Sequence, residues 1–89
     1  MKTRIAADKL FSELDGTHVS VGGSHCTVQV FGVIDEPGRR WVQVALEGDC
    51  RTVLTLRLRP NQGPRHAVRE LAHWLVDPET TPSVVQHVA

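Results

Sequence analysis

The sequence predicts a single small α+β domain: a short N-terminal helix, a four-stranded antiparallel meander, and a C-terminal helix packed on one face of the sheet. Four segments alternate apolar and polar residues with the period of two that a half-buried strand requires. Turn-forming glycine and proline residues separate them, and after the fourth segment the spacing changes to that of a helix. The 89 residues suffice for one domain. We place it at residues 1–77, with residues 78–89 as a C-terminal tail of unpredicted position.

The N-terminal helix is predicted over residues 6–15. Its apolar residues recur at the spacing of one helix face: Ala7, Leu10, Phe11 and Leu14. Gly16 can end the helix in a left-handed conformation. Because so short a helix is marginal in water, it must pack on an apolar surface.

The first two strands form a hairpin around Gly22–Gly23. Both glycines accept the positive φ that a two-residue turn requires. This turn sets Val21 opposite Ser24 and Val19 opposite Cys26. The apolar residues of both strands then share one face of the sheet.

Two further turns bound the third and fourth strands. Asp35–Gly38 contains a proline and a glycine, which favour a turn, and Gly48–Cys50 can form a three-residue loop. The third strand is predicted over residues 40–46 and the fourth over residues 51–59. Pairing their apolar sides leaves one sheet face almost wholly aliphatic.

This aliphatic face sets Val44 opposite Leu54 and Val42 opposite Leu56, and it needs a cover. Residues 64–76 provide one as a helix, because proline suits its first position and Asp77-Pro78 ends it. The apolar stripe of this helix consists of Ala67, Val68, Leu71, Trp74 and Leu75.

The opposite, outer face of the sheet is the first candidate binding surface. Its predicted apolar residues are Phe31, Val33, Trp41, Ala45 and Val53. An exposed apolar patch usually marks a contact, so we expect the N-terminal helix or a second subunit to cover it. The alternative is a platform on which nucleic-acid bases stack, because two of these residues are aromatic and arginines lie nearby.

The second candidate surface is a cluster of four arginines, Arg57, Arg59, Arg65 and Arg69. They lie at the end of the fourth strand and in the first turns of the C-terminal helix, where free backbone amides also favour anions. A phosphate or an acidic segment could bind there through guanidinium groups. The alternative is a solvated surface paired with Glu70 and Asp77.

The histidines do not predict a metal site. His66, Glu70 and His73 share one helical face, but structural zinc usually takes four ligands, and this face offers three. His18 and His25 should lie diagonally across the first hairpin within reach of one ion, but the sequence reveals no residues that would support them as ligands.

The two cysteines, Cys26 and Cys50, are predicted to lie near each other. With Val30 opposite Val44, Cys26 falls opposite Gly48, beside the loop that holds Cys50. The geometry would allow a disulfide, whereas a reducing compartment would keep both thiols free.

The composition is that of an ordinary globular domain. Ten basic residues balance ten acidic ones, so the formal net charge at pH 7 is zero, whereas nucleic-acid binders usually carry a clear basic excess. No run approaches the roughly 18 apolar residues that span a bilayer. The first residues lack the apolar run of a secretion signal. We therefore expect a cytoplasmic protein that does not bind membranes.

The sequence shows no nucleophile with a base and an orienting group, no phosphate-binding loop and no paired carboxylates. We therefore expect no catalytic residues, no cofactor and no metal. The function that the sequence favours is a non-catalytic binding or interaction module acting as a homodimer, with a further protein partner as an option. The alternative is a nucleic-acid-associated protein that uses the arginine cluster and the Phe31 and Trp41 face.

Overall fold

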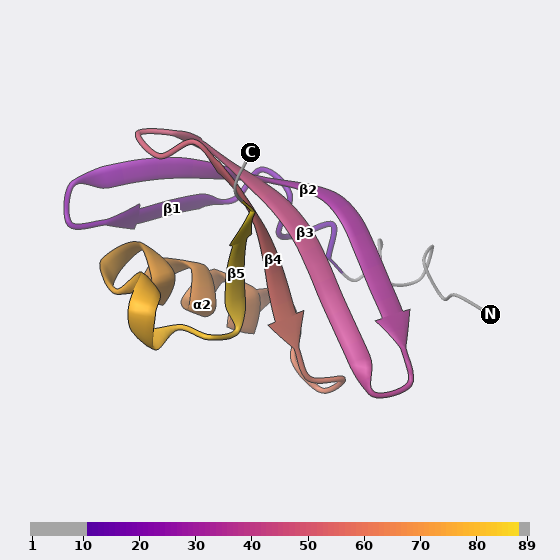
Figure 1. The fold of residues 1–89 in the computed structure, drawn as a ribbon. Helices are drawn as coiled ribbons and strands as arrows, with labels where there is room; N and C mark the ends of the chain where they lie inside the picture. The colour runs from indigo at the N-terminus through magenta and orange to yellow at the C-terminus, as the bar shows by residue number, and fades with distance from the viewer. Residues whose placement is uncertain (1–10, 88–89) are drawn as a thin grey trace.

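The computed structural model describes residues 11–87 as an antiparallel five-stranded sheet with one α-helix against it (Figure 1). Each strand lies beside its neighbours in the sequence. In chain order the elements are β1 (His18–Val21), β2 (Ser24–Glu36), β3 (Arg39–Gly48), β4 (Thr52–Leu58), α2 (Pro64–Val76), a 3₁₀ turn η1 (Pro78–Thr80) and β5 (Val84–His87).

The pairing of β1 with β2 and of β3 with β4 confirms the predicted register. Val19 lies opposite Cys26, and Val44 lies opposite Leu54. Gly22 and Gly23 have φ angles of 57° and 89°, as a tight hairpin turn requires. The alternation of apolar residues and the turn chemistry therefore specify the same meander.

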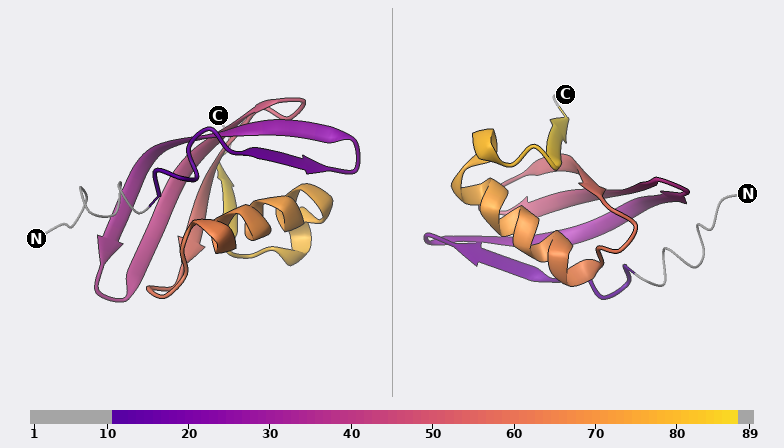
Figure 2. Two further views of the ribbon diagram at one scale, coloured as in Figure 1. Left: turned by 180° about the vertical axis from the view of Figure 1, so that it is seen from behind. Right: turned by 90° about the horizontal axis from the view of Figure 1, so that it is seen from below.

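The helix α2 begins at Pro64 and ends at Val76, as predicted. It lies against one face of the sheet, the inner face (Figure 2), and buries Ala67, Leu71 and Trp74 there. The strands contribute most of this core: Val19, Cys26, Val28, Val33, Val42, Val44, Leu46, Leu54, Leu56, Leu58 and Val84.

The predicted N-terminal helix is wrong for its described part, and residues 6–10 lie outside the described residues. Phe11 and Leu14 are fully buried, but they sit in tight turns in which the Leu14 N–H donates to the Phe11 carbonyl at 3.0 Å. The segment then runs along β2, where the Asp15 carboxylate accepts the Val30 N–H at 2.8 Å. Apolar residues three positions apart, such as Phe11 and Leu14, suit such turns as well as a helix. The hydrogen bonds from this segment to β2 favour the turns.

The four-stranded sheet is also wrong, because the predicted tail supplies a fifth strand. Residues Val84–His87 pair antiparallel with β4, and Val84 enters the core. The Thr81 hydroxyl helps to hold the connection, donating to the Asp77 carbonyl at 2.9 Å. The described fold is therefore mostly β with one C-terminal helix.

A β-bulge at Phe31 changes the facing of the second half of β2. Val30 lies opposite Val44, but the next pair is Gly32 with Gln43, so Phe31 is an extra residue. Val33 then lies opposite Val42 and is only 3% exposed. The predicted position of Val33 on the outer face is therefore wrong, because one inserted residue reverses the alternation beyond it.

Candidate functional site

The candidate site is the outer face of the sheet, the side opposite α2. The register brings three cross-strand rows together there: Ile34, Trp41 and Arg57; Gly32, Gln43, Thr55 and Val85; and Ala45, Val53 and His87. Within residues 11–87 no helix or strand packs over these rows (Figure 2). Of the predicted interface residues, Trp41 and Val53 lie on this face, and Phe31 projects from the bulge with 54% of its surface exposed.

Trp41 is the centre of the face because two arginines contact its ring. The guanidinium carbon of Arg39 lies 4.8 Å from the ring centroid, and that of Arg57 lies 5.6 Å from it. These distances are typical of cation–π contacts. Arg39 also pairs with Glu36 at 2.6 Å, so its charge is partly balanced.

A hollow of about 220 Å³ opens beside Trp41. Its lining residues are Ile34, Trp41, Gln43, Thr55, Arg57, Val85 and His87. Thr55 is nearly buried, and its hydroxyl shares a hydrogen bond with Nε2 of His87. This contact crosses from β4 to β5, so the fifth strand completes one wall of the hollow.

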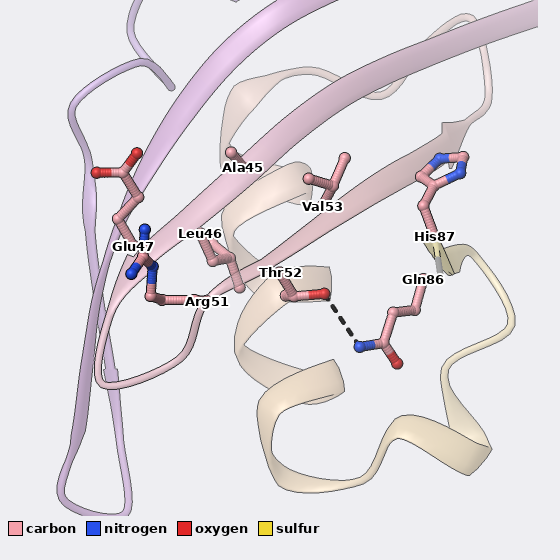
Figure 3. A pocket seen from close by; sticks show the side chains of 8 residues that line it. All are labelled: Ala45, Leu46, Glu47, Arg51, Thr52, Val53, Gln86 and His87. Carbon is pink, nitrogen blue, oxygen red and sulfur yellow. Dashed lines mark hydrogen bonds between the residues drawn. The ribbon is translucent and has the colours of Figure 1, made fainter. Parts of the chain in front are cut away.

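A second, wider hollow of about 530 Å³ adjoins the first at His87 (Figure 3). Ala45 and Val53 line it on the outer face, and Glu47 and Arg51 lie at its far end. Below them the Gln86 side-chain amide donates to the Thr52 hydroxyl at 3.0 Å. The outer face therefore opens into two hollows, one beside a large aromatic ring and one that begins over Ala45 and Val53 and extends to Leu46, Thr52 and Gln86.

The structure does not bring the four predicted arginines into one patch. Arg57 lies on the outer face against Trp41. Arg65 and Arg69 lie on α2, which covers the opposite face, and Arg59 is exposed beyond the end of β4. Because the sheet separates these groups, the basic residues that contact Trp41 are Arg39 and Arg57, and Arg51 lines the wider hollow.

The polar face of α2 holds the C-terminal segment. Glu70 lies 3.9 Å from His66 and accepts a hydrogen bond from the Ser83 hydroxyl, whereas His73 bonds to Thr81. Among residues 11–87 no three His, Cys, Asp or Glu side chains gather closely enough to hold a metal ion.

The two predicted neighbours Cys26 and Cys50 do meet, and both are free thiols. Cys26 is buried beneath the β3–β4 loop, and Cys50 is half-buried beside it. Burial raises the pKa of the Cys50 thiol, and the charge and hydrogen bond of Cys26 raise it further. The structure therefore places both thiols on the core side of the loop, away from the Trp41 ring.

Sequence reasoning missed four residues of the site: Ile34, Thr55, Val85 and His87. Ile34 reaches the outer face only because of the bulge, and Gly32 within the strand was the available signal. Adding a side chain at Gly32 would bring its first carbon within 2.6 Å of the Gln43 amide oxygen. Val85 and His87 belong to β5, whose paired valines after Pro82 are a short strand signal.

Comparisons of the chain with models of protein families, with curated proteins and with solved structures find no match. No helix in the described part of the chain is long and apolar enough to cross a membrane.

Proposed function

We propose that the protein is a non-catalytic interaction module that works in the cytoplasm, where two copies associate through their outer sheet faces. The observation that carries this proposal is the uncovered hollow beside Trp41. An aromatic ring with apolar neighbours, ringed by arginine and other polar groups, is the composition of an interface core with its rim. Tryptophan and arginine are also the residues that most often dominate binding energy.

The distribution of apolar residues supports the proposal. The inner face is filled by α2 and by Phe11 and Leu14, so the described N-terminal segment adds to the core and leaves the outer face open. Val53 remains 40% exposed. A domain of this size has a thin core, so burial of a second apolar face would add substantially to its stability.

The test is sedimentation velocity of the wild type and of Trp41→Ala over micromolar to submillimolar concentrations. We expect a reversible dimer that Trp41→Ala weakens by about 2 kcal/mol or more, the range of a central interface tryptophan. The fold should persist, because Trp41 is not in the core cluster.

The matched control is Val76→Ala, which removes an apolar side chain that is 66% exposed at the end of α2, away from the outer face. It should leave the dimer unchanged. A strict monomer at every concentration would overturn the proposal, and equal weakening by both substitutions would show that the outer face is not the contact.

The second candidate function is binding of single-stranded nucleic acid, and the stack of Arg39, Trp41 and Arg57 is the observation that favours it. Bases would stack on the ring, with the guanidinium groups near phosphates. Affinity for a short oligonucleotide should then fall steeply with added salt and be lost in Trp41→Ala. Absence of any salt-sensitive binding removes this candidate.

A further inference from the structure

The outer side of β3 carries a gradient of charge and size along its length. The residues that point outward are, in order, Arg39, Trp41, Gln43, Ala45 and Glu47. A cation and a large ring occupy one end, and a methyl group and an anion occupy the other. Gln43 lies at the middle, opposite Thr55 of β4.

The outward-facing residues of β3 are complementary to those of a second copy whose β3 runs in the opposite direction. A two-fold axis that runs across the strands through Gln43 and Thr55 would place each end of β3 over the opposite end of the partner's β3. Arg39 then meets the partner's Glu47, and Trp41 meets the partner's Ala45. Two sheets stacked in this way keep their strands nearly aligned, as in known sheet-on-sheet packing.

We infer that two copies stack outer face to outer face in this antiparallel orientation, with Trp41 of each copy seated in the hollow over Ala45 and Val53 of the other. The inference rests on the proposed function and adds the orientation and the contacts. The hollow of about 530 Å³ gives the ring room. Glu47 at its end, where Arg51 also lies, offers the Arg39 beside Trp41 an anion.

The other two-fold arrangement, in which the two β3 strands run parallel, is unfavourable on electrostatic grounds. An axis parallel to the strands through β3 would set Arg39 against the partner's Arg39 and Glu47 against the partner's Glu47. Like charges placed opposite each other in an interface disfavour that pairing.

A standard interface buries about 800 Å² on each partner, which is about one seventh of the 5731 Å² surface of this chain. One sheet face can supply such an area.

The test is a charge exchange read by sedimentation. Arg39→Glu and Glu47→Lys should each weaken the dimer at least about tenfold, because each sets like charges together at both ends of the interface. The double variant should recover most of the wild-type affinity, because it reverses both partners of each pair. Glu79→Lys, on the exposed 3₁₀ turn η1, makes the same charge change away from the sheet and should have no effect.

A second variant tests the hollow without changing charge. Ala45→Trp fills it and should weaken the dimer at least about tenfold, whereas Ala45→Ser should not. Circular dichroism of each variant establishes that the sheet is intact.

The outcomes separate the inference from the function on which it rests. Rescue by the double variant supports the antiparallel orientation. A dimer that Trp41→Ala weakens, but that is indifferent to the charge exchange and to Ala45→Trp, overturns the orientation and leaves the interaction module standing. A chain that is monomeric throughout overturns both, and salt-sensitive oligonucleotide binding by that monomer would point to the second candidate function.

Discussion

At the scale of single residues, Gly48 shows how closely the β3–β4 loop is packed on β2. It lies opposite Cys26 with φ of +121°, a conformation that residues with a side chain rarely adopt. A first side-chain carbon placed there would lie 2.5 Å from the carbonyl oxygen of His25. The N–H of the neighbouring Asp49 donates to the same His25 carbonyl, and the Asp49 carboxylate accepts from the His25 N–H. The loop therefore has little freedom to move away.

We expect Gly48→Ala to lower the free energy of unfolding by about 2–3 kcal/mol, because backbone strain and the clash with His25 act together. The matched control is Gly22→Ala, which has φ of +57° and no atom within 4 Å of the added carbon. It should cost about 1 kcal/mol through strain alone. Urea unfolding of both variants measures the difference, and equal losses would show that the β3–β4 loop shifts to admit the methyl group.

The cysteine pair yields a second prediction at this scale. Burial and the contact with Cys26 raise the pKa of Cys50, so less of its thiol is ionised at a given pH. Because the thiolate is the nucleophile, iodoacetamide should modify Cys50 more slowly in the native protein than in urea. Cys26 should react more slowly still, since it is buried.

The Cys26→Ser variant serves as the control for this experiment, because it removes the neighbouring thiol and should speed the native reaction of Cys50. Mass spectrometry of time points at mildly alkaline pH gives both rates. Equal rates for Cys50 in the native and unfolded chains would contradict the buried contact.

At the scale of elements, β5 joins the core to the candidate site. Val84 faces inward opposite Leu56, and Val85 faces outward opposite Thr55 into the hollow beside Trp41. The Ser83 hydroxyl donates to Glu70 of α2 and the Thr81 hydroxyl shares a hydrogen bond with His73, and these bonds hold the connection in place. A strand of four residues thus covers the edge of β4 and forms a wall of the site.

We expect Val84→Ala to lower the free energy of unfolding by about 1–3 kcal/mol, through lost burial and the cavity that remains. Val85→Ala removes the same atoms from the outer face and should cost less than about 1 kcal/mol. Thermal or urea unfolding at low concentration, where the proposed dimer would be dissociated, distinguishes the two. Indistinguishable losses would mean that β5 does not dock as described.

At the scale of the whole molecule, association and folding should be linked. The chain has one thin core and a second apolar face, so a dimer that forms only from folded chains would raise stability by mass action. Each tenfold increase in concentration above the dissociation constant adds about 0.7 kcal/mol per chain, which for a domain of this size raises the melting temperature by about 3–6 °C.

Scanning calorimetry over two decades of concentration measures this dependence. The wild type should show the rise, and Trp41→Ala should melt at a nearly constant temperature. A wild-type melting temperature that does not depend on concentration would contradict a dimer in this range.

The sequence by itself determined the parts of the molecule that depend on local patterns. Alternating valines and leucines specified the pairing of Val44 with Leu54, the two glycines specified the first turn, and the apolar stripe after Pro64 specified α2. Trp41 and Val53 were placed correctly on the outer face for the same reason. Within a regular element the period decides which side a residue takes.

Only the tertiary structure decided the rest, because those features depend on contacts between distant segments. The bulge at Phe31 turned Val33 inward and Ile34 outward, and the sheet separated Arg57 from the arginines of α2. Residues 11–16 form turns bonded to β2 in place of the predicted helix, which would be marginal by itself. Residues 84–87 form a strand because they pair with the edge of β4. Short segments have weak preferences of their own, so the surface on which each one packs selects its conformation.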